Sequence, residues 1–62
     1  MYEPDKGMSF YGAIKELQDL LKYEGQEYRI MKFNDILITV SHDSNIDDLS
    51  TIYELKRKLA RL

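Results

Sequence analysis

The spacing of apolar residues changes twice along the chain, and this change limits the possible fold more than any other feature. From Ser9 onward, apolar residues recur at three- and four-residue steps, which is typical of one face of a helix. Over residues 26–41 they alternate or run together, as they do in strands. The helical spacing returns after Ser44. The sequence therefore predicts the order helix, strand, strand, helix.

The first periodic segment predicts an amphipathic helix from about Phe10 to Tyr23. Ser9 is a suitable N-cap, because its hydroxyl can accept a hydrogen bond from the first turn. Gly25 is a suitable stop, because glycine adopts the left-handed backbone that ends many helices. The preceding residues show no periodicity. We assign residues 1–8 to an N-terminal arm and residues 9–62 to a single α+β domain.

A hairpin is predicted around Asn34-Asp35, because both residues tolerate the positive φ of a two-residue turn. This turn pairs Phe33 with Ile36, Met31 with Ile38 and Arg29 with Val40 on one side, which is the expected core face. The other side of the ribbon carries Tyr28, Ile30, Lys32, Leu37, Thr39 and Ser41. We expect this mixed side to face solvent or a partner.

The second helix is predicted to begin after Ser44 or Asn45 and to end at about Arg61. Asp47 or Asp48 stands where a capping box would place glutamate. The apolar arc of this helix consists of Ile46, Leu49, Ile52, Tyr53, Leu55, Leu59 and Leu62. We expect the arc to pack on the hairpin, although part of it also fits a short interchain coiled coil. The predicted fold is α-β-β-α, with both helices covering one face of an antiparallel hairpin.

Self-association is expected because the chain is short and has no disulfide. A domain of 62 residues buries only about 60% of the surface that its unfolded chain exposes. The segment 36–40 is uncharged, prone to form a strand and free of proline, so it would make an exposed sheet edge that attracts other strands. The sequence thus predicts a homodimer in which these strands pair antiparallel, with a four-stranded sheet across the dimer.

Membrane and cofactor signals are weak throughout the sequence. The longest apolar run, residues 36–38, is far shorter than the roughly 20 residues that span a bilayer. Residues 1–5 do not resemble a signal peptide, and the lack of cysteine fits a reducing compartment, so a cytoplasmic protein without membrane contact is expected. No glycine-rich phosphate loop is present, and we expect no cofactor.

A catalytic or metal-binding interpretation centres on Ser41-His42-Asp43-Ser44. Serine, histidine and aspartate are the residue types of a nucleophilic catalytic triad. The side chains of a triad converge from different parts of the fold, whereas neighbours in sequence point in different directions. His42, Asp43, Asp47 and Asp48 are possible metal ligands whose spacing matches no known loop. We expect a strand end and a helix-capping loop here, and neither a metal site nor an enzyme.

Tyrosine supplies most of the aromatic side chains of this chain. It is enriched in interface hot spots, and it also occurs at the margins of cores, so both interpretations stay open for the helix tyrosines. The predicted partner-binding residues are Tyr11, Tyr23, Tyr28, Tyr53, Leu37 and Thr39. The leading hypothesis is a small non-catalytic regulatory protein, inhibitor or adaptor that binds another protein.

The alternative hypothesis is a nucleic-acid-binding regulator. Its phosphate contacts would be Lys56, Arg57, Lys58 and Arg61, the basic cluster of the second helix. Cations at the end of a helix also offset the helix dipole, and the formal net charge of −2 supplies no overall attraction to phosphate. The sequence therefore ranks nucleic-acid binding second.

Overall fold

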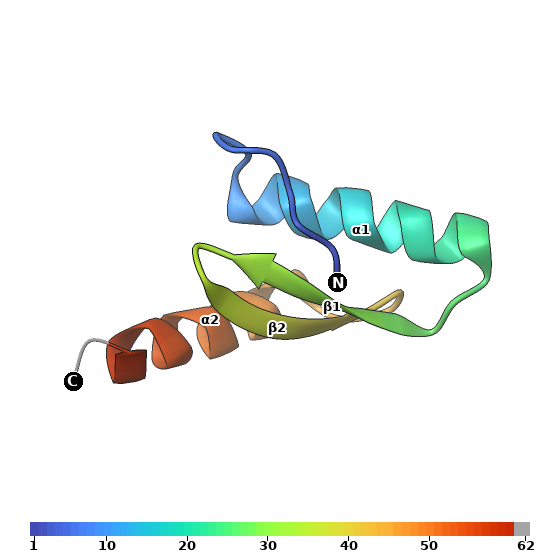
Figure 1. Cartoon of the computed structure of the whole chain (residues 1–62). Coiled ribbons are helices and arrows are strands. Elements are labelled where there is room, and N and C mark those ends of the chain that lie inside the picture. Colours follow the sequence, from blue (N-terminus) through green and yellow to red (C-terminus); the bar gives the residue numbers. More distant parts are fainter. Residues whose placement is uncertain (61–62) are drawn as a thin grey trace.

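The computed structural model describes residues 1–60 of the chain (Figure 1). Its elements are α1 (Phe10–Glu24), β1 (Tyr28–Phe33), β2 (Ile36–Ser41) and α2 (Ile46–Ala60). The predicted α-β-β-α order and the α+β class are confirmed. The last residues predicted for the second helix, Arg61 and Leu62, lie outside the described residues.

Both predicted ends of α1 are confirmed. The Ser9 hydroxyl oxygen accepts a hydrogen bond of 3.0 Å from the Gly12 N–H, and Ser9 itself has an extended backbone. Gly25 adopts φ +68°, and its N–H donates to the Lys22 carbonyl oxygen at 3.3 Å. A side chain at Gly25 would be strained in this left-handed conformation, so glycine is favoured where the helix stops.

The hairpin has the predicted two-residue turn and register. Asn34 and Asp35 have φ of 48° and 66°, and two successive positive values are the mark of a type I′ turn. Antiparallel pairing runs from Phe33 opposite Ile36 to Tyr28 opposite Ser41. The buried side chains of the ribbon are Met31, Ile38 and Val40, with Phe33 and Ile36 half-buried beside them. The predicted core face is therefore correct.

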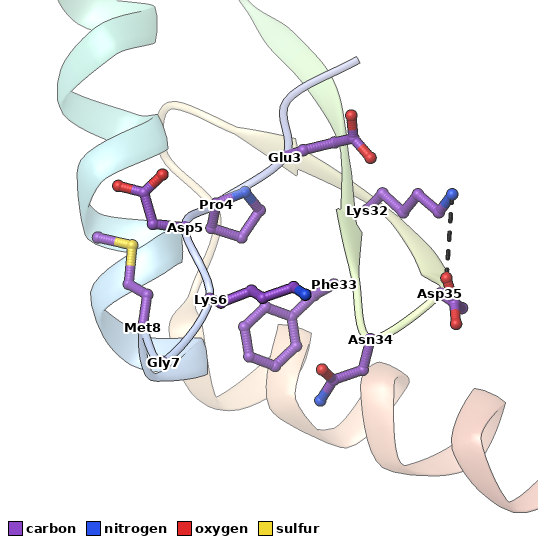
Figure 2. Close-up of a pocket in the computed structure, with 10 residues that line it drawn as sticks. All are labelled: Glu3, Pro4, Asp5, Lys6, Gly7, Met8, Lys32, Phe33, Asn34 and Asp35. Atoms are coloured by element: carbon purple, nitrogen blue, oxygen red, sulfur yellow. Dashed lines mark ion pairs between the residues drawn. The ribbon is translucent and has the colours of Figure 1, made fainter.

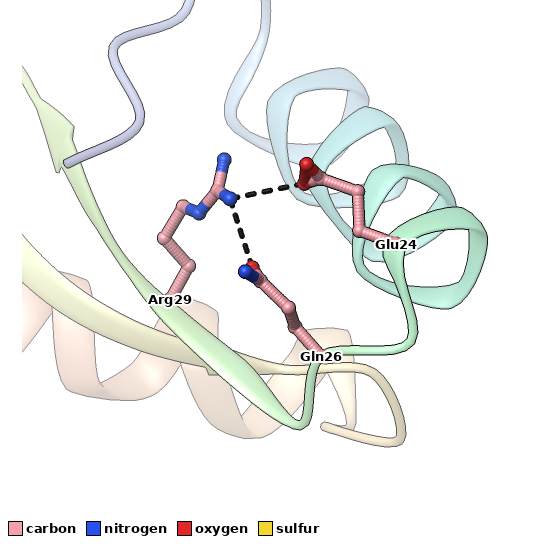
Figure 3. A network of polar contacts seen from close by, with 3 residues as sticks. All are labelled: Glu24, Gln26 and Arg29. Carbon is pink, nitrogen blue, oxygen red and sulfur yellow. Dashed lines mark hydrogen bonds and ion pairs between the residues drawn. The ribbon is translucent and has the colours of Figure 1, made fainter.

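Arg29 lies on the core side of the ribbon but at its end, and its guanidinium group turns toward solvent. Its Nη2 atom donates to Glu24 Oε1 at 3.0 Å and to Gln26 Oε1 at 2.8 Å (Figure 3). These contacts tie β1 to the end of α1 and to the connection that follows. They belong to the surface, where such an ion pair adds about 1 kcal/mol or less.

The core lies between the hairpin and the helices. α1 contributes the buried side chains Ala13, Ile14, Leu17 and Leu21, and α2 contributes Leu49 and Tyr53. The Tyr53 ring stacks near Phe10 with centroids 4.8 Å apart, and it meets Phe33 edge-on at 5.6 Å. This aromatic group joins both helices to the turn end of the hairpin, where the Asn34 side chain donates to the Tyr53 hydroxyl at 3.0 Å.

The N-terminal arm pairs with the outer edge of β1. The Tyr2 N–H donates to the Ile30 carbonyl oxygen, and the Lys32 N–H donates to the Tyr2 carbonyl oxygen, each at 2.9 Å. Together they form a short parallel bridge beside β1, where the N-terminus also lies in Figure 1. The arm therefore covers part of the edge of β1, and β2 has the more open edge.

α2 begins as predicted but buries less of its apolar arc than expected. Asn45 Oδ1 accepts the N–H groups of Asp47 at 2.8 Å and Asp48 at 3.2 Å, which caps the helix. Three further apolar side chains of the arc stay between 42% and 67% exposed: Ile52, Leu55 and Leu59. The arc is wider than the surface available to it, because the last turns of α2 project past the hairpin (Figure 1). Within residues 1–60, no helix has the length and apolarity needed to cross a membrane.

Candidate protein-binding surface

The side of the hairpin that faces away from the helices carries exposed apolar groups. We call this side, formed by Tyr28, Ile30, Lys32, Leu37, Thr39 and Ser41, the outer face. Its three large apolar side chains, Tyr28, Ile30 and Leu37, are 43% to 61% exposed. The alternation along β1 and β2 produces this arrangement, because every second side chain points away from the core.

The outer face has an apolar centre with polar groups at its margins. Ile30 lies opposite Thr39 and diagonal to Leu37, while Lys32 lies opposite Leu37 near the turn. With strands of six residues, about 3.3 Å per residue and about 4.8 Å between strands, this face covers roughly 200 Å². A standard interface buries about 800 Å² per partner, so the outer face alone is small for a stable contact.

The free edge of β2 adjoins the outer face. The register directs the backbone groups of Leu37, Thr39 and Ser41 away from β1. The Ser41 N–H already donates to Ser44 Oγ at 3.0 Å, and Lys56 Nζ donates to the Leu37 carbonyl oxygen at 2.8 Å. Within residues 1–60, the Leu37 N–H and both Thr39 backbone groups have no hydrogen-bond partner. This edge is the most accessible backbone of the described sheet.

The predicted partner-binding tyrosines do not lie together. Tyr28 is on the outer face, whereas Tyr11 and Tyr23 project from α1 in the helix layer, where both are exposed. Tyr53 is only 6% exposed, and its ring belongs to the core. The structure thus brings Tyr28, Leu37 and Thr39 to one surface and leaves the α1 tyrosines elsewhere.

The basic residues of α2 are spread around the helix. Lys56, Arg57 and Lys58 are consecutive, so each points about 100° away from the one before. Lys56 is already bonded to the edge of β2. The fourth predicted member, Arg61, lies outside the described residues. The three described cations therefore do not share one helix face.

A shallow hollow of about 250 Å³ lies between the arm and the turn end of the hairpin (Figure 2). Its walls carry charges of both signs, including Glu3, Asp5 and Lys6, and the Lys32–Asp35 ion pair at 3.9 Å lies at its margin. Small-molecule sites are usually about 300 Å³ or larger and mostly apolar. The hollow lacks the convergent buried polar groups that would orient a ligand.

The segment after β2 serves as a loop cap. Ser41 Oγ donates to Asp43 Oδ1 at 3.0 Å and contacts Ser44 Oγ, and His42 is exposed. The described hydrogen bonds do not link the His42 ring to a serine hydroxyl, as a triad would require. Within residues 1–60, no three side chains of histidine, aspartate or glutamate gather closely enough to hold a metal ion.

Two polar anchors were not predicted from the sequence. The Gln18 side chain is buried, and its Nε2 donates to the carbonyl oxygens of Ser41 at 3.2 Å and Ser44 at 2.9 Å. The Tyr2 hydroxyl donates to Glu16 Oε1 at 2.6 Å. Burial, together with this hydrogen bond, raises the pKa of Tyr2 to about 12. Both anchors join segments far apart in sequence, so no local pattern reveals them.

Comparisons with protein-family models, with curated proteins and with solved structures found no match to this chain.

Proposed function

We propose that this protein is a non-catalytic regulatory or adaptor module that binds another protein through the outer face. The observation that carries the proposal is the exposure of Tyr28, Ile30 and Leu37 on one side of a two-stranded ribbon. Aromatic and aliphatic anchors of this kind supply most of the energy of protein interfaces. The partner that fits is a protein with an apolar patch ringed by acceptors for the Lys32 ammonium and the Tyr28 hydroxyl.

Affinity capture with matched variants tests this proposal. The bait is the full chain, used as the unmodified protein and as Leu37→Lys, which puts a charge on an apolar residue of the outer face without changing the core. The control is Thr51→Lys, which adds the same charge at an exposed position of α2. A protein that co-purifies with the unmodified chain and with Thr51→Lys, but is lost with Leu37→Lys, supports the proposal.

Two outcomes would count against the outer face. If every captured protein is retained equally by Leu37→Lys and by the control, binding occurs elsewhere on the molecule. If capture is reduced equally by both variants, the added charge and not its position causes the loss. Tyr11 and Tyr23 then become the next residues to vary, because they are the other exposed aromatic side chains predicted to bind a partner.

Nucleic-acid binding through Lys56, Arg57, Lys58 and Arg61 is the weaker proposal. The three described cations do not share one helix face, and Lys56 would have to leave the edge of β2 to reach a phosphate. Salt distinguishes the two proposals, because phosphate contacts weaken steeply as salt rises, whereas apolar contacts with a protein respond little.

A further inference from the structure

We propose that a second copy of this chain binds along the open edge of β2, with the β2 strands of both copies antiparallel about a two-fold axis through Ile38. The result is a homodimer with one sheet running through both copies. The dimer uses the edge of β2 and one side of α2, so it leaves the outer face accessible. The observations that favour the dimer therefore do not rest on the partner binding proposed above.

The backbone of β2 selects the position of the axis. An axis through Ile38 places Leu37 of each copy opposite Thr39 of the other. These are the residues whose backbone groups point away from β1, and each opposed pair exchanges both of its N–H to carbonyl hydrogen bonds. The edge is thus complementary to itself, as a two-fold interface requires.

The neighbouring register, with an axis through Thr39, is much less favourable. It would need the backbone of Ser41, whose N–H is held by Ser44 Oγ at 3.0 Å. The Ser41 carbonyl oxygen also accepts from the Ser44 N–H at 3.1 Å and from Gln18 Nε2 at 3.2 Å. Pairing there would break the loop that leads into α2, so the open part of the edge is centred on Ile38.

The exposed side of α2 lies next to this edge. α2 follows the end of β2 and runs back beside it, because Lys56 reaches the Leu37 carbonyl oxygen. The buried side chains of α2, Leu49 and Tyr53, lie on one side of Lys56 around the helix axis. The exposed stripe lies on the other side of Lys56 and consists of Ile52, Leu55 and Leu59. The exposed stripe is therefore on the edge side of α2. A two-fold axis at Ile38 places the exposed stripe of each copy next to α2 of the other copy, which covers part of it.

Charge favours a second copy as the occupant. α2 has Asp47 and Asp48 in its first turn and Arg57 and Lys58 in its last turn. The two-fold axis relates the α2 helices of both copies, so these helices run antiparallel. Each acidic first turn then lies beside the basic last turns of the other copy. A parallel arrangement would instead place like charges together.

Lys56 is the contact that must change when the strands pair. Its ammonium lies at the open edge, a common way in which proteins protect exposed strands. The Leu37 carbonyl oxygen has two lone pairs and can accept the Thr39 N–H of the second copy. The Lys56 ammonium then turns to the acidic first turn of the second copy's α2. Because two chains associate, the fraction of dimer rises with protein concentration.

Sedimentation of the full chain, from low micromolar to submillimolar concentration, tests the dimer. Thr39→Pro removes an outward N–H, and Ile30→Pro is its matched control, because Ile30 lies opposite Thr39 and its N–H points to the other edge. Leu55→Glu charges the α2 stripe, and Tyr23→Glu puts the same charge on an exposed apolar side chain of α1 instead. We expect Thr39→Pro and Leu55→Glu to weaken dimerisation on the order of tenfold or more, and both controls to leave it unchanged.

A monomer at every concentration would overturn the proposal, and so would a dimer that resists Thr39→Pro or Leu55→Glu. Because proline also restricts the backbone of the hairpin itself, amide hydrogen exchange of the unmodified chain gives a second measurement. The Leu37 and Thr39 amides should exchange more slowly as the concentration rises. Exchange at these two amides that does not depend on concentration would also overturn strand pairing.

Discussion

Leu17 and Ile38 occupy the centre of the core, one on α1 and one on β2, and both side chains are buried. Leu17→Ala and Ile38→Ala should each lower the free energy of unfolding by about 2 to 5 kcal/mol, because truncation leaves a cavity. Leu37→Ala is the control, since Leu37 neighbours Ile38 but faces outward, and we expect a change of about 0.5 kcal/mol or less. Chemical denaturation measures all three. Equal losses for Ile38→Ala and Leu37→Ala would refute the assignment of the two faces.

The Tyr2 hydroxyl makes the stability of the folded state depend on pH in the alkaline range. Its pKa is raised to about 12 by burial and by the hydrogen bond to Glu16, so the folded state keeps the hydroxyl proton more tightly than the unfolded state does. The stabilisation from this group is complete below the ordinary pKa of 10.0 and is lost as the pH rises toward about 12.

The variant Tyr2→Phe isolates this effect, because the other tyrosines titrate in both proteins. We expect the unmodified protein to lose more stability than Tyr2→Phe when thermal unfolding is followed from below pH 10.0 to about pH 12. Parallel losses in the two proteins would mean that the Tyr2 hydroxyl does not hold the arm in solution.

Lys58 serves to test nucleic-acid binding with little risk to the fold. It is exposed on α2, so Lys58→Glu should change the free energy of unfolding by about 0.5 kcal/mol or less. If the alternative function holds, the unmodified protein binds nucleic acid at low salt and Lys58→Glu binds more weakly. Fluorescence anisotropy with a labelled oligonucleotide measures both. Lack of binding by the unmodified protein at low salt would remove the alternative.

At the scale of elements, the parts that could be predicted from the sequence are those that local chemistry determines. Ser9 and Gly25 define the ends of α1 through their own backbone and side-chain preferences. Asn34 and Asp35 define the turn, and the turn defines the register of every cross-strand pair. The faces of β1 and β2 follow directly from that register.

The parts that could not be predicted depend on which surface each element meets. The spacing of Ile52, Leu55 and Leu59 is the same whether the stripe packs inside one chain or faces outward. The pairing of Tyr2 with β1 uses backbone groups, which any residue would supply. Sequence reasoning therefore found the apolar arc of α2 but assigned too much of it to the core, and it assigned no pairing to the arm.

At the scale of the whole molecule, the proposed dimer would enlarge the surface that is available to a protein partner. Pairing at the edge of β2 would align the outer faces of two copies side by side, because Ile38 of both copies points to the helix side. The combined face covers roughly 400 Å², twice the area of one hairpin. A single described chain is elongated, 38 × 22 × 17 Å, and pairing along the edge adds the partner surface that it lacks.

Dimerisation and partner binding should respond differently to substitutions in the outer face and in α2. Leu37→Lys should abolish partner capture while leaving dimerisation intact, because the Leu37 side chain is on the outer face and its backbone is on the edge. Leu55→Glu should weaken dimerisation, and it should weaken partner capture without abolishing it. Loss of dimerisation in Leu37→Lys, measured by sedimentation, would show that the outer face is itself the contact between copies.

The central claim is that the outer face binds a protein partner, and amide chemical-shift mapping tests it most directly. The isotope-labelled full chain is titrated with the partner recovered by capture. We predict that the largest shifts fall on residues 28–32 and 36–40, with the amides of Tyr11 and Tyr23 unchanged. A footprint on α1 or on the last turns of α2, with the outer face unperturbed, would contradict the claim.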